Sequence, residues 1–136
     1  MDFSTSMKVA AAGLKAQSDR MKTIAENIAN ANSAASTQGG EPYRRKIATV
    51  SSNFDRELGA EVVKPGKPMN DMSEFRNQYD PGNPLADKQG YVKMPNVNSL
   101  VEIMDMQDAQ RSYEADLTVM TATKGMLANT VELLKK

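Results

Sequence analysis

The sequence contains no cysteine and no histidine. Without histidine, no side chain has an unperturbed pKa close to neutral pH, so imidazole acid–base catalysis is excluded. Without cysteine, the chain can form neither a disulfide nor a thiolate nucleophile, and Cys/His zinc sites are excluded as well. The catalytic chemistry that remains would need a closed site to shift the pKa values of carboxylate, lysine or tyrosine groups. The composition therefore favours a structural subunit over an enzyme.

A net charge and long apolar runs are also missing. The 17 basic residues balance 17 acidic ones, so electrostatics gives no reason to expect nucleic acid or an anionic membrane as a partner. No stretch approaches the ~20 apolar residues that span a bilayer. Residues 1–15 lack the regions of a secretory signal, so we expect any export to occur without a cleaved signal peptide.

The carboxylates show no spacing that is typical of a chemical site. Asp105 and Asp108 share a helix face by their spacing, and we interpret them as part of a solvated surface. The acidic residues between 71 and 87 lack the spacing of a calcium loop, and no phosphate-binding glycine loop occurs. We therefore expect no catalytic, cofactor-binding or metal-binding residues and no small-molecule substrate.

Prolines divide the chain into three segments. All six lie between residues 42 and 95, where they exclude long helices. The sequence predicts a mainly α protein, in which a coiled-coil helix within residues 1–33 and another within 96–136 together form a core. Residues 34–95 form a small β-containing middle segment.

Three stretches of the middle segment are candidate strands: Tyr43–Val50, Glu61–Lys64 and Gly90–Met94. Residues 65–89 are rich in turn-forming residues and give no clear prediction.

Both terminal segments carry apolar side chains at coiled-coil spacing. The first helix is expected over residues 3–30 and the second from about Asn98 to Leu134, with either Asn98 or a Ser99–Glu102 capping box at its start. The second of these helices would be ~55 Å long at 1.5 Å per residue. Such a helix cannot bury itself within so short a chain, so we expect neighbouring subunits to cover part of it.

Gly13 and Gly125 lie inside these helices among small residues. Glycine costs about 1 kcal/mol in a helix relative to alanine, which is either a tolerated weakness or a sign of close helix approach. We predict that the helices are antiparallel with level free ends, and that the two glycines face each other.

Asn27, Asn30 and Asn32 are an unusual polar set for a helix end. A left-handed helix stop accounts for Asn30 and Asn32. We expect Asn27 to be a buried amide that fixes the register of the coiled coil.

Tyr43, Arg44, Arg45 and Lys46 place a basic run on a candidate strand. The run is too small for a nucleic-acid patch. It either protects a strand edge or contacts an acidic protein neighbour, and we regard it as a possible outer contact.

The expected helix-packing or subunit-interface residues share seam positions or small size on the two helices. They are Met7, Ala10, Gly13, Leu14, Met21, Ile24, Asn27, Ile28, Asn30, Asn32, Tyr113, Leu117, Met120, Gly125, Leu127, Val131 and Leu134.

Several motifs resemble those of bacterial flagellar axial proteins, which form the rod, hook and hook junction. GLKAQSDRMKTIAENIANANS at residues 13–33 is similar to their N-terminal signature. Four further motifs resemble those of the proximal rod subunits: PYRRK at 42–46, YDPGNPLAD at 79–87, GYVKMPNVN at 90–98 and QRSYEADLTVM at 110–120.

This resemblance implies a periplasmic rod subunit of the flagellar basal body that is exported unfolded by the type III apparatus. The implied partners are copies of itself, the other proximal rod proteins, the rod–export-gate adaptor, the membrane (MS) ring and the distal rod protein. Two alternatives stay open: a different axial protein, and a cytoplasmic coiled-coil adaptor or export chaperone.

Overall fold

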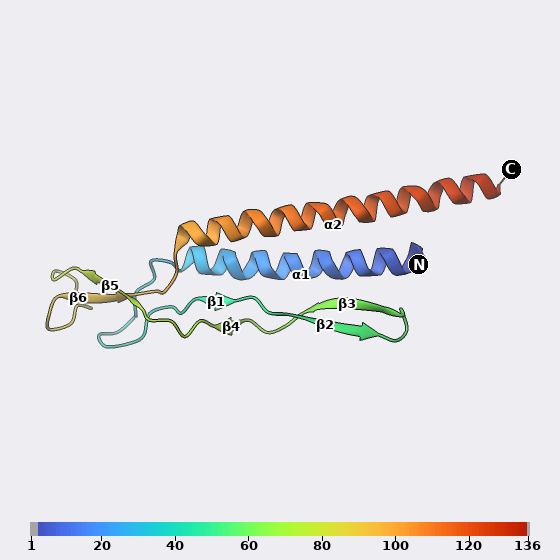
Figure 1. The fold of residues 1–136 in the computed structure, drawn as a ribbon. Helices are drawn as coiled ribbons and strands as arrows, with labels where there is room; N and C mark the ends of the chain where they lie inside the picture. The colour runs from blue at the N-terminus through green and yellow to red at the C-terminus, as the bar shows by residue number, and fades with distance from the viewer. Residues whose placement is uncertain (1–2, 136) are drawn as a thin grey trace. The chain divides into compact units, whose positions relative to one another are not determined.

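Along the chain, two long helices flank a middle segment of short strands in the computed structural model, which describes residues 3–135 (Figure 1). This mainly α architecture confirms the predicted fold class. Along the chain the elements are α1 (Phe3–Ala29), β1 (Lys46–Ile47), β2 (Val50–Asp55), β3 (Ala60–Pro65), β4 (Met69–Asn70), β5 (Arg76–Tyr79), β6 (Tyr91–Met94) and α2 (Ser99–Leu134).

The strands form three separate antiparallel pairs, β1 with β4, β2 with β3, and β5 with β6. The chain divides into two compact units, and both helices contribute to each. Unit 1 consists of Met1–Met21, Thr49–Lys67 and Gln107–Lys136, and unit 2 of Lys22–Ala48 and Pro68–Met106.

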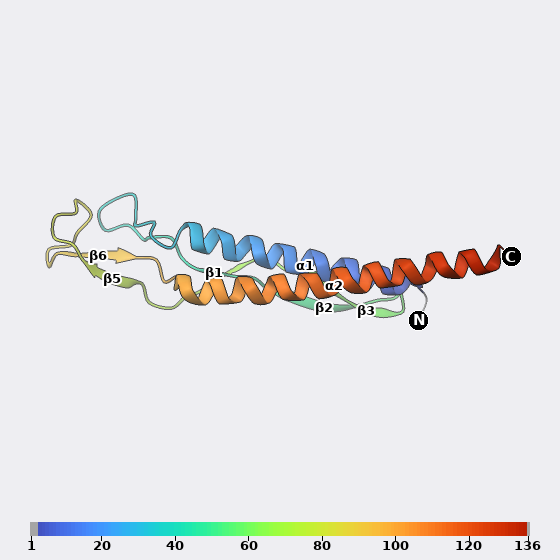
Figure 2. The ribbon, with the colours of Figure 1, turned by 90° about the horizontal axis from the view of Figure 1, so that it is seen from above.

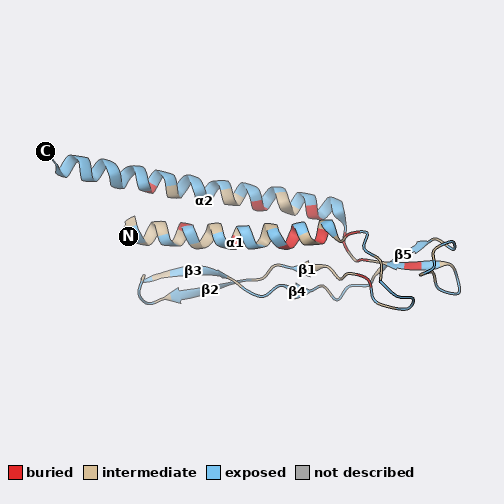
Figure 3. Cartoon of the chain, turned by 180° about the vertical axis from the view of Figure 1, so that it is seen from behind, coloured by how far each residue is buried: buried red, intermediate tan, exposed pale blue. Residues whose placement is uncertain are grey.

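In unit 1 the first part of α1 lies between the last part of α2 and the β2–β3 hairpin (Figures 1 and 3). The two helical parts run in opposite directions, as the view from above also shows (Figure 2). Ala10 and Ala16 of α1 and Val62 of the hairpin are buried. The outer surface of α2 is almost entirely exposed in this unit (Figure 3).

Unit 2 has a small core where the end of α1 meets the strands and loops of the middle segment. Its buried apolar residues are Ile24, Ala31, Val92 and Val97. On the β5–β6 pair the rings of Tyr79 and Tyr91 meet edge to face, with centroids 5.2 Å apart. Side chains as polar as Asn27 and Glu102 are buried in the same unit, which is where we place the candidate site.

The start of α2 decides between the two predicted caps. Asn98 is the N-cap, because its Oδ1 accepts a hydrogen bond from the backbone N–H of Leu100, and its carbonyl accepts one from Glu102. The alternative of a Ser99–Glu102 capping box is wrong. Ser99 already lies inside the helix, and the Glu102 side chain turns inward to Asn27 and Arg45 instead.

The end of α1 falls at the predicted asparagines but not by the predicted geometry. No non-glycine residue within 3–135 has a positive φ, so a left-handed asparagine stop is wrong. Asn30 instead donates to the carbonyl of Glu26 twice, from its backbone N–H at 3.1 Å and from its side-chain Nδ2 at 2.8 Å, and so closes the last turn of the helix.

The middle segment is only partly as predicted. Glu61–Lys64 lies in β3 and the stretch ending at Met94 contains β6, but the expected strand Tyr43–Val50 is regular only at β1 and at the first residue of β2. No sequence pattern predicted β4 and β5, which lie in the turn-rich stretch. Within residues 3–135, neither helix has an apolar run long enough to cross a membrane.

Candidate functional site

Asn27 is the centre of a buried polar cluster in unit 2. Its side chain is 1% exposed. Its Nδ2 donates to the backbone carbonyl of Lys46 at 2.8 Å and to Oε2 of Glu102 at 3.0 Å. Its Oδ1 accepts from the backbone N–H of Lys46 and from the Tyr43 hydroxyl, both at 2.9 Å. The amide thus uses its full hydrogen-bonding capacity, two bonds given and two received.

The two bonds to Lys46 let the Asn27 amide act as a strand would. A neighbouring strand offers one donor and one acceptor to a residue of β1, and Asn27 offers the same pair from a helix. This anchors the middle segment to α1 at one residue. Because aspartate or leucine has no equivalent set of donors and acceptors, the site is specific for an amide.

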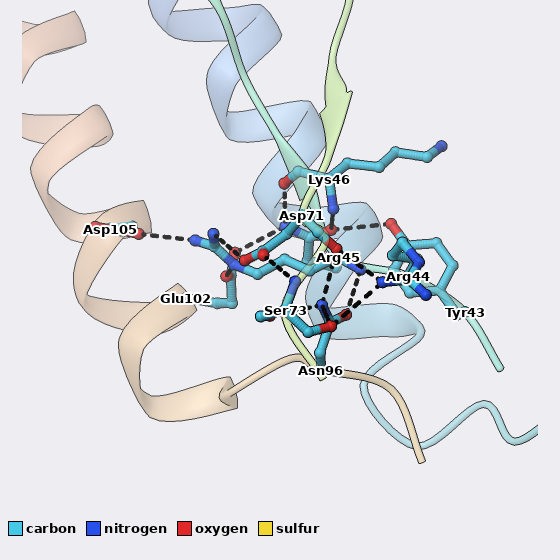
Figure 4. Close-up of polar contacts among 10 residues, drawn as sticks. Tyr43, Arg44, Arg45, Lys46, Asp71, Ser73, Asn96, Glu102 and Asp105 are labelled. Atoms are coloured by element: carbon cyan, nitrogen blue, oxygen red, sulfur yellow. Dashed lines mark hydrogen bonds and ion pairs between the residues drawn. The ribbon is translucent and has the colours of Figure 1, made fainter. Parts of the chain in front are cut away.

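Arg45 connects the cluster to α2 (Figure 4). Its Nε contacts Oε1 of Glu102 at 2.5 Å, and its terminal nitrogens lie 3.5 Å from Asp71 and 3.7 Å from Asp105. Burial would lower the pKa of Arg45, but the hydrogen bond and charge of Glu102, together with Asp71, outweigh it and raise the pKa. Glu102 is 1% exposed, and a buried carboxylate needs such a charged partner.

The neighbours of Arg45 are also held within the unit. Arg44 donates to the carbonyls of Asp71 and Ser73, each at 3.2 Å, and its guanidinium lies over the Phe75 ring, 4.2 Å from the ring centre. Lys46 pairs with Glu26 at 3.1 Å. The basic run therefore meets acidic and carbonyl groups of its own chain. A further contact of this run with a neighbouring subunit stays a prediction.

Burial raises the pKa of the Tyr43 hydroxyl, against the opposing charge of Lys46. The pKa of Asp71 is lowered, first by the backbone N–H and hydroxyl of Ser73 and then by Arg45. Tyr43 is thus neutral and Asp71 charged over the physiological range, which are the states that the cluster requires.

Two residues that sequence reasoning did not single out complete the connection. The Asn96 side chain accepts from the backbone N–H of Arg45 at 2.8 Å and donates to the carbonyl of Asp71 at 3.0 Å (Figure 4). Arg76 donates to the carbonyls of Pro95 and Ala31. Asn96 lies in the GYVKMPNVN motif, which could have indicated that it is a functional residue. Arg76 lies outside every motif, so no sequence pattern indicated its role.

The predicted helix-packing residues differ widely in exposure. Three of them are buried: Ala10, Ile24 and Asn27. The half-buried ones are Met7, Gly13, Leu14, Met21, Ile28, Asn30, Tyr113 and Met120. The exposed ones are Asn32, Leu117, Gly125, Leu127, Val131 and Leu134. Their roles at subunit interfaces stay a prediction.

The predicted pairing of the two glycines is wrong. A methyl group added at Gly13 would lie 2.6 Å from Oδ2 of Asp116, whereas one added at Gly125 would meet no atom within 4 Å. Asp116 precedes Gly125 by nine residues, ~13.5 Å along a helix. The free ends in unit 1 are therefore not level, because α2 continues beyond the start of α1. A match between small residues does not predict this offset, because the carboxylate of Asp116 occupies the space over Gly13.

Comparison with known proteins agrees with the motifs. A family model described as flagella basal body rod protein matches residues 7–35, and one described as flagellar basal body rod FlgEFG protein C-terminal matches residues 88–133.

Full-length relatives extend these matches across the middle segment. The chain is 49% identical over 133 residues to the flagellar basal-body rod protein FlgC of Agrobacterium fabrum, covering 98% of this chain and 96% of that protein. It is 39% identical over 145 residues to FlgC of Bacillus subtilis, with 96% and 97% covered. It is 36% identical over 135 residues to FlgC of Aquifex aeolicus, with 99% of each chain covered.

Paired long helices with exposed apolar faces, joined by a fully bonded polar cluster, define a helical structural subunit of an assembly. The chain belongs to the FlgC family of flagellar basal-body rod proteins. It is a structural subunit of the flagellar basal-body rod and is located there, together with other rod components. None of these relatives is named as a cytoplasmic adaptor, an export chaperone or a different axial protein.

Proposed function

We propose that this chain polymerises through its terminal helices into the proximal part of the rod, a shaft that transmits torque around the export channel. Its function is mechanical. In this proposal residues 1–33 and 96–136 form the inner axial core, and residues 34–95 pack outside it.

The observation that carries the proposal is the exposure of α2 in unit 1. Large apolar side chains are exposed along its last five turns, because no other described residue of unit 1 covers them. They are Leu117, Val119, Met126, Leu127, Val131, Leu133 and Leu134. A soluble monomer rarely exposes so continuous an apolar surface, and an assembly subunit buries it against neighbours.

The partners follow from the resemblance to proximal rod subunits. We expect contacts with copies of this chain, the other proximal rod proteins, the rod–export-gate adaptor, the membrane ring and the distal rod protein. The chain would reach the periplasm through the type III apparatus without a cleaved signal peptide.

The test is to replace the gene with a version that carries a small tag in the 65–68 loop, and to image purified basal bodies with a tag-specific label. Label on the lower rod, between membrane ring and distal rod, is the expected result. A control strain tagged on the distal rod protein should be labelled further out. Absence of the tagged chain from basal bodies of motile cells would contradict the proposal, as would label at the hook.

A further inference from the structure

The β2–β3 hairpin has two chemically different faces. Its register pairs Ser52 with Val63 and Phe54 with Glu61, so alternate residues point to opposite sides. On one side Val62 is 6% exposed. On the other side Val50 is 61% exposed and Phe54 62% exposed.

We call this second side, formed by Val50, Ser52, Phe54, Glu61, Val63 and Pro65, the hairpin outer face. Within the described residues, β2 and β3 bond only to each other, so neither strand edge is covered. The face carries three large apolar side chains, Val50, Phe54 and Val63. Its one carboxylate, on Glu61, makes no hydrogen bond or ion pair with any group between residues 3 and 135. An uncovered surface of this kind indicates a protein contact.

A surface of matching composition and opposite charge lies on α2. Leu117, Lys124 and Val131 are seven residues apart and therefore lie along one line of the helix. We call this line the α2 flank stripe. All three residues are exposed. The ammonium group of Lys124 has no ion pair or hydrogen bond within the part of the chain that the structure describes.

The layers of unit 1 keep these two surfaces apart within one copy. The hairpin and α2 lie on opposite sides of α1 (Figure 1). The hairpin outer face is also the side away from the buried Val62. The two surfaces can therefore meet only between different copies. A contact between unlike surfaces of identical chains repeats, and it yields a ring or a helical assembly.

We propose that the hairpin outer face of one copy docks on the α2 flank stripe of the next copy, with Glu61 paired to Lys124. This rests on the proposed function as a polymerising rod subunit and names the surfaces that join neighbouring copies. The apolar residues supply the buried area, and the single charge pair fixes how the two surfaces are aligned. The occupant is a second copy because the chain itself carries the complementary stripe.

The absence of native cysteine makes the contact directly testable by crosslinking. A chain with both Glu61→Cys and Lys124→Cys is expected to give a ladder of dimers, trimers and larger species in purified basal bodies treated with a short thiol crosslinker. Either single variant should give no crosslinked species, since each surface meets an unlike surface. A ladder that is absent in the double variant, or a crosslink to a protein of another size, would overturn the proposal.

Charge exchange gives a second, independent measurement. Glu61→Lys alone and Lys124→Glu alone should each lower incorporation into basal bodies roughly fivefold, because each brings like charges together. The chain with both substitutions should recover incorporation. Glu57→Lys, in the hairpin turn beside this face, is the matched control and should leave incorporation unchanged. Failure of the double variant to recover, with both single variants impaired, contradicts the pairing.

These results separate this contact from the proposed function. If the unmodified chain is found in the lower rod but no ladder forms, the chain remains a rod subunit and the docking of hairpin on α2 is wrong. If the unmodified chain is missing from basal bodies, the proposed function itself fails.

Discussion

Asn27 of α1 and Glu102 of α2 are in direct contact, with 3.0 Å between Nδ2 and Oε2, although 75 residues separate them in the sequence. Both are 1% exposed. Each also bonds to the segment 43–46, Asn27 through Tyr43 and Lys46 and Glu102 through Arg45. One helix, one strand and the other helix thus meet at a single polar point, and loss of any one leaves buried polar groups without partners.

We expect Asn27→Leu to destabilise unit 2 by about 1–3 kcal/mol or more, because the Lys46 backbone and the Tyr43 hydroxyl lose buried partners. The measurement is the urea concentration that releases the chain from purified basal bodies. Asn53→Leu, at an exposed position of β2, is the control and should leave it unchanged. A release midpoint equal to that of the unmodified chain would show that the amide is dispensable.

Arg45→Lys should weaken the same cluster. Lysine keeps the charge but cannot reach Glu102, Asp71 and Asp105 with a rigid planar group. Loss of one charge-assisted bond corresponds to about 1.5–3 kcal/mol. Arg111→Lys is the matched control, because Arg111 is exposed and its nearest carboxylate, Asp108, lies 3.9 Å away. If both variants are released at the same urea concentration, the planar guanidinium group of Arg45 does not contribute to the stability of the cluster.

Acid should remove the contribution of Asp71. Its pKa is lower in the folded chain than its usual 3.8, so the folded state binds fewer protons and stability increases with pH through that range. The contribution is complete above the unfolded pKa and is lost as pH falls through the folded pKa. The chain should therefore be more resistant to urea than its Asp71→Asn variant at pH 7, and the difference should shrink as the pH falls below the usual 3.8 and disappear once the folded carboxylate is protonated. A difference that is constant with pH would contradict this assignment.

Leu127→Asp is expected to abolish incorporation into the rod, and with it motility, while export of the subunit continues. Leu127 is 40% exposed in the single chain, and neighbouring subunits would bury the introduced charge against apolar side chains. Asn129→Asp adds the same charge two residues on, about 200° further around the helix, and should have a weaker effect. Motility assays and detection of the exported chain measure the two results. A motile Leu127→Asp strain would show that no neighbour covers this position.

The isolated subunit should be monomeric or prone to aggregate, with residues 3–30 and 100–134 largely disordered. The helices bury too little apolar surface to offset an ordering cost of ~1–2 kcal/mol per residue. Hydrogen exchange on the purified chain would show rapid exchange across both segments. Slow exchange there would mean that the helices form before assembly and are not coupled to it.

Local patterns predicted the helices because heptad spacing and the restriction of proline to the middle are properties of neighbouring residues. Asn27 stood out because an amide is unfavourable inside a helix, and its burial is confirmed. Glu102 was misinterpreted because a capping box needs only four consecutive residues, whereas its true partner is 57 positions away. Two-residue strands such as β4 have too few residues to show a period. The pairing of Gly13 with Asp116 depends on how the two helices are offset, which composition does not specify.

The distance in sequence between Asn27 and Glu102 also sets the time at which folding can finish. A chain delivered end to end, whether by a ribosome or through a narrow pore, cannot complete the Asn27 cluster until both ends of this 75-residue interval are present. Until then Asn27, Arg45 or Glu102 lacks a partner, and the partly delivered chain has little reason to fold. The position of Glu102 in the sequence thus delays folding. The chain stays flexible enough to pass through a narrow pore until Glu102 has been delivered, and the cluster can form only after that.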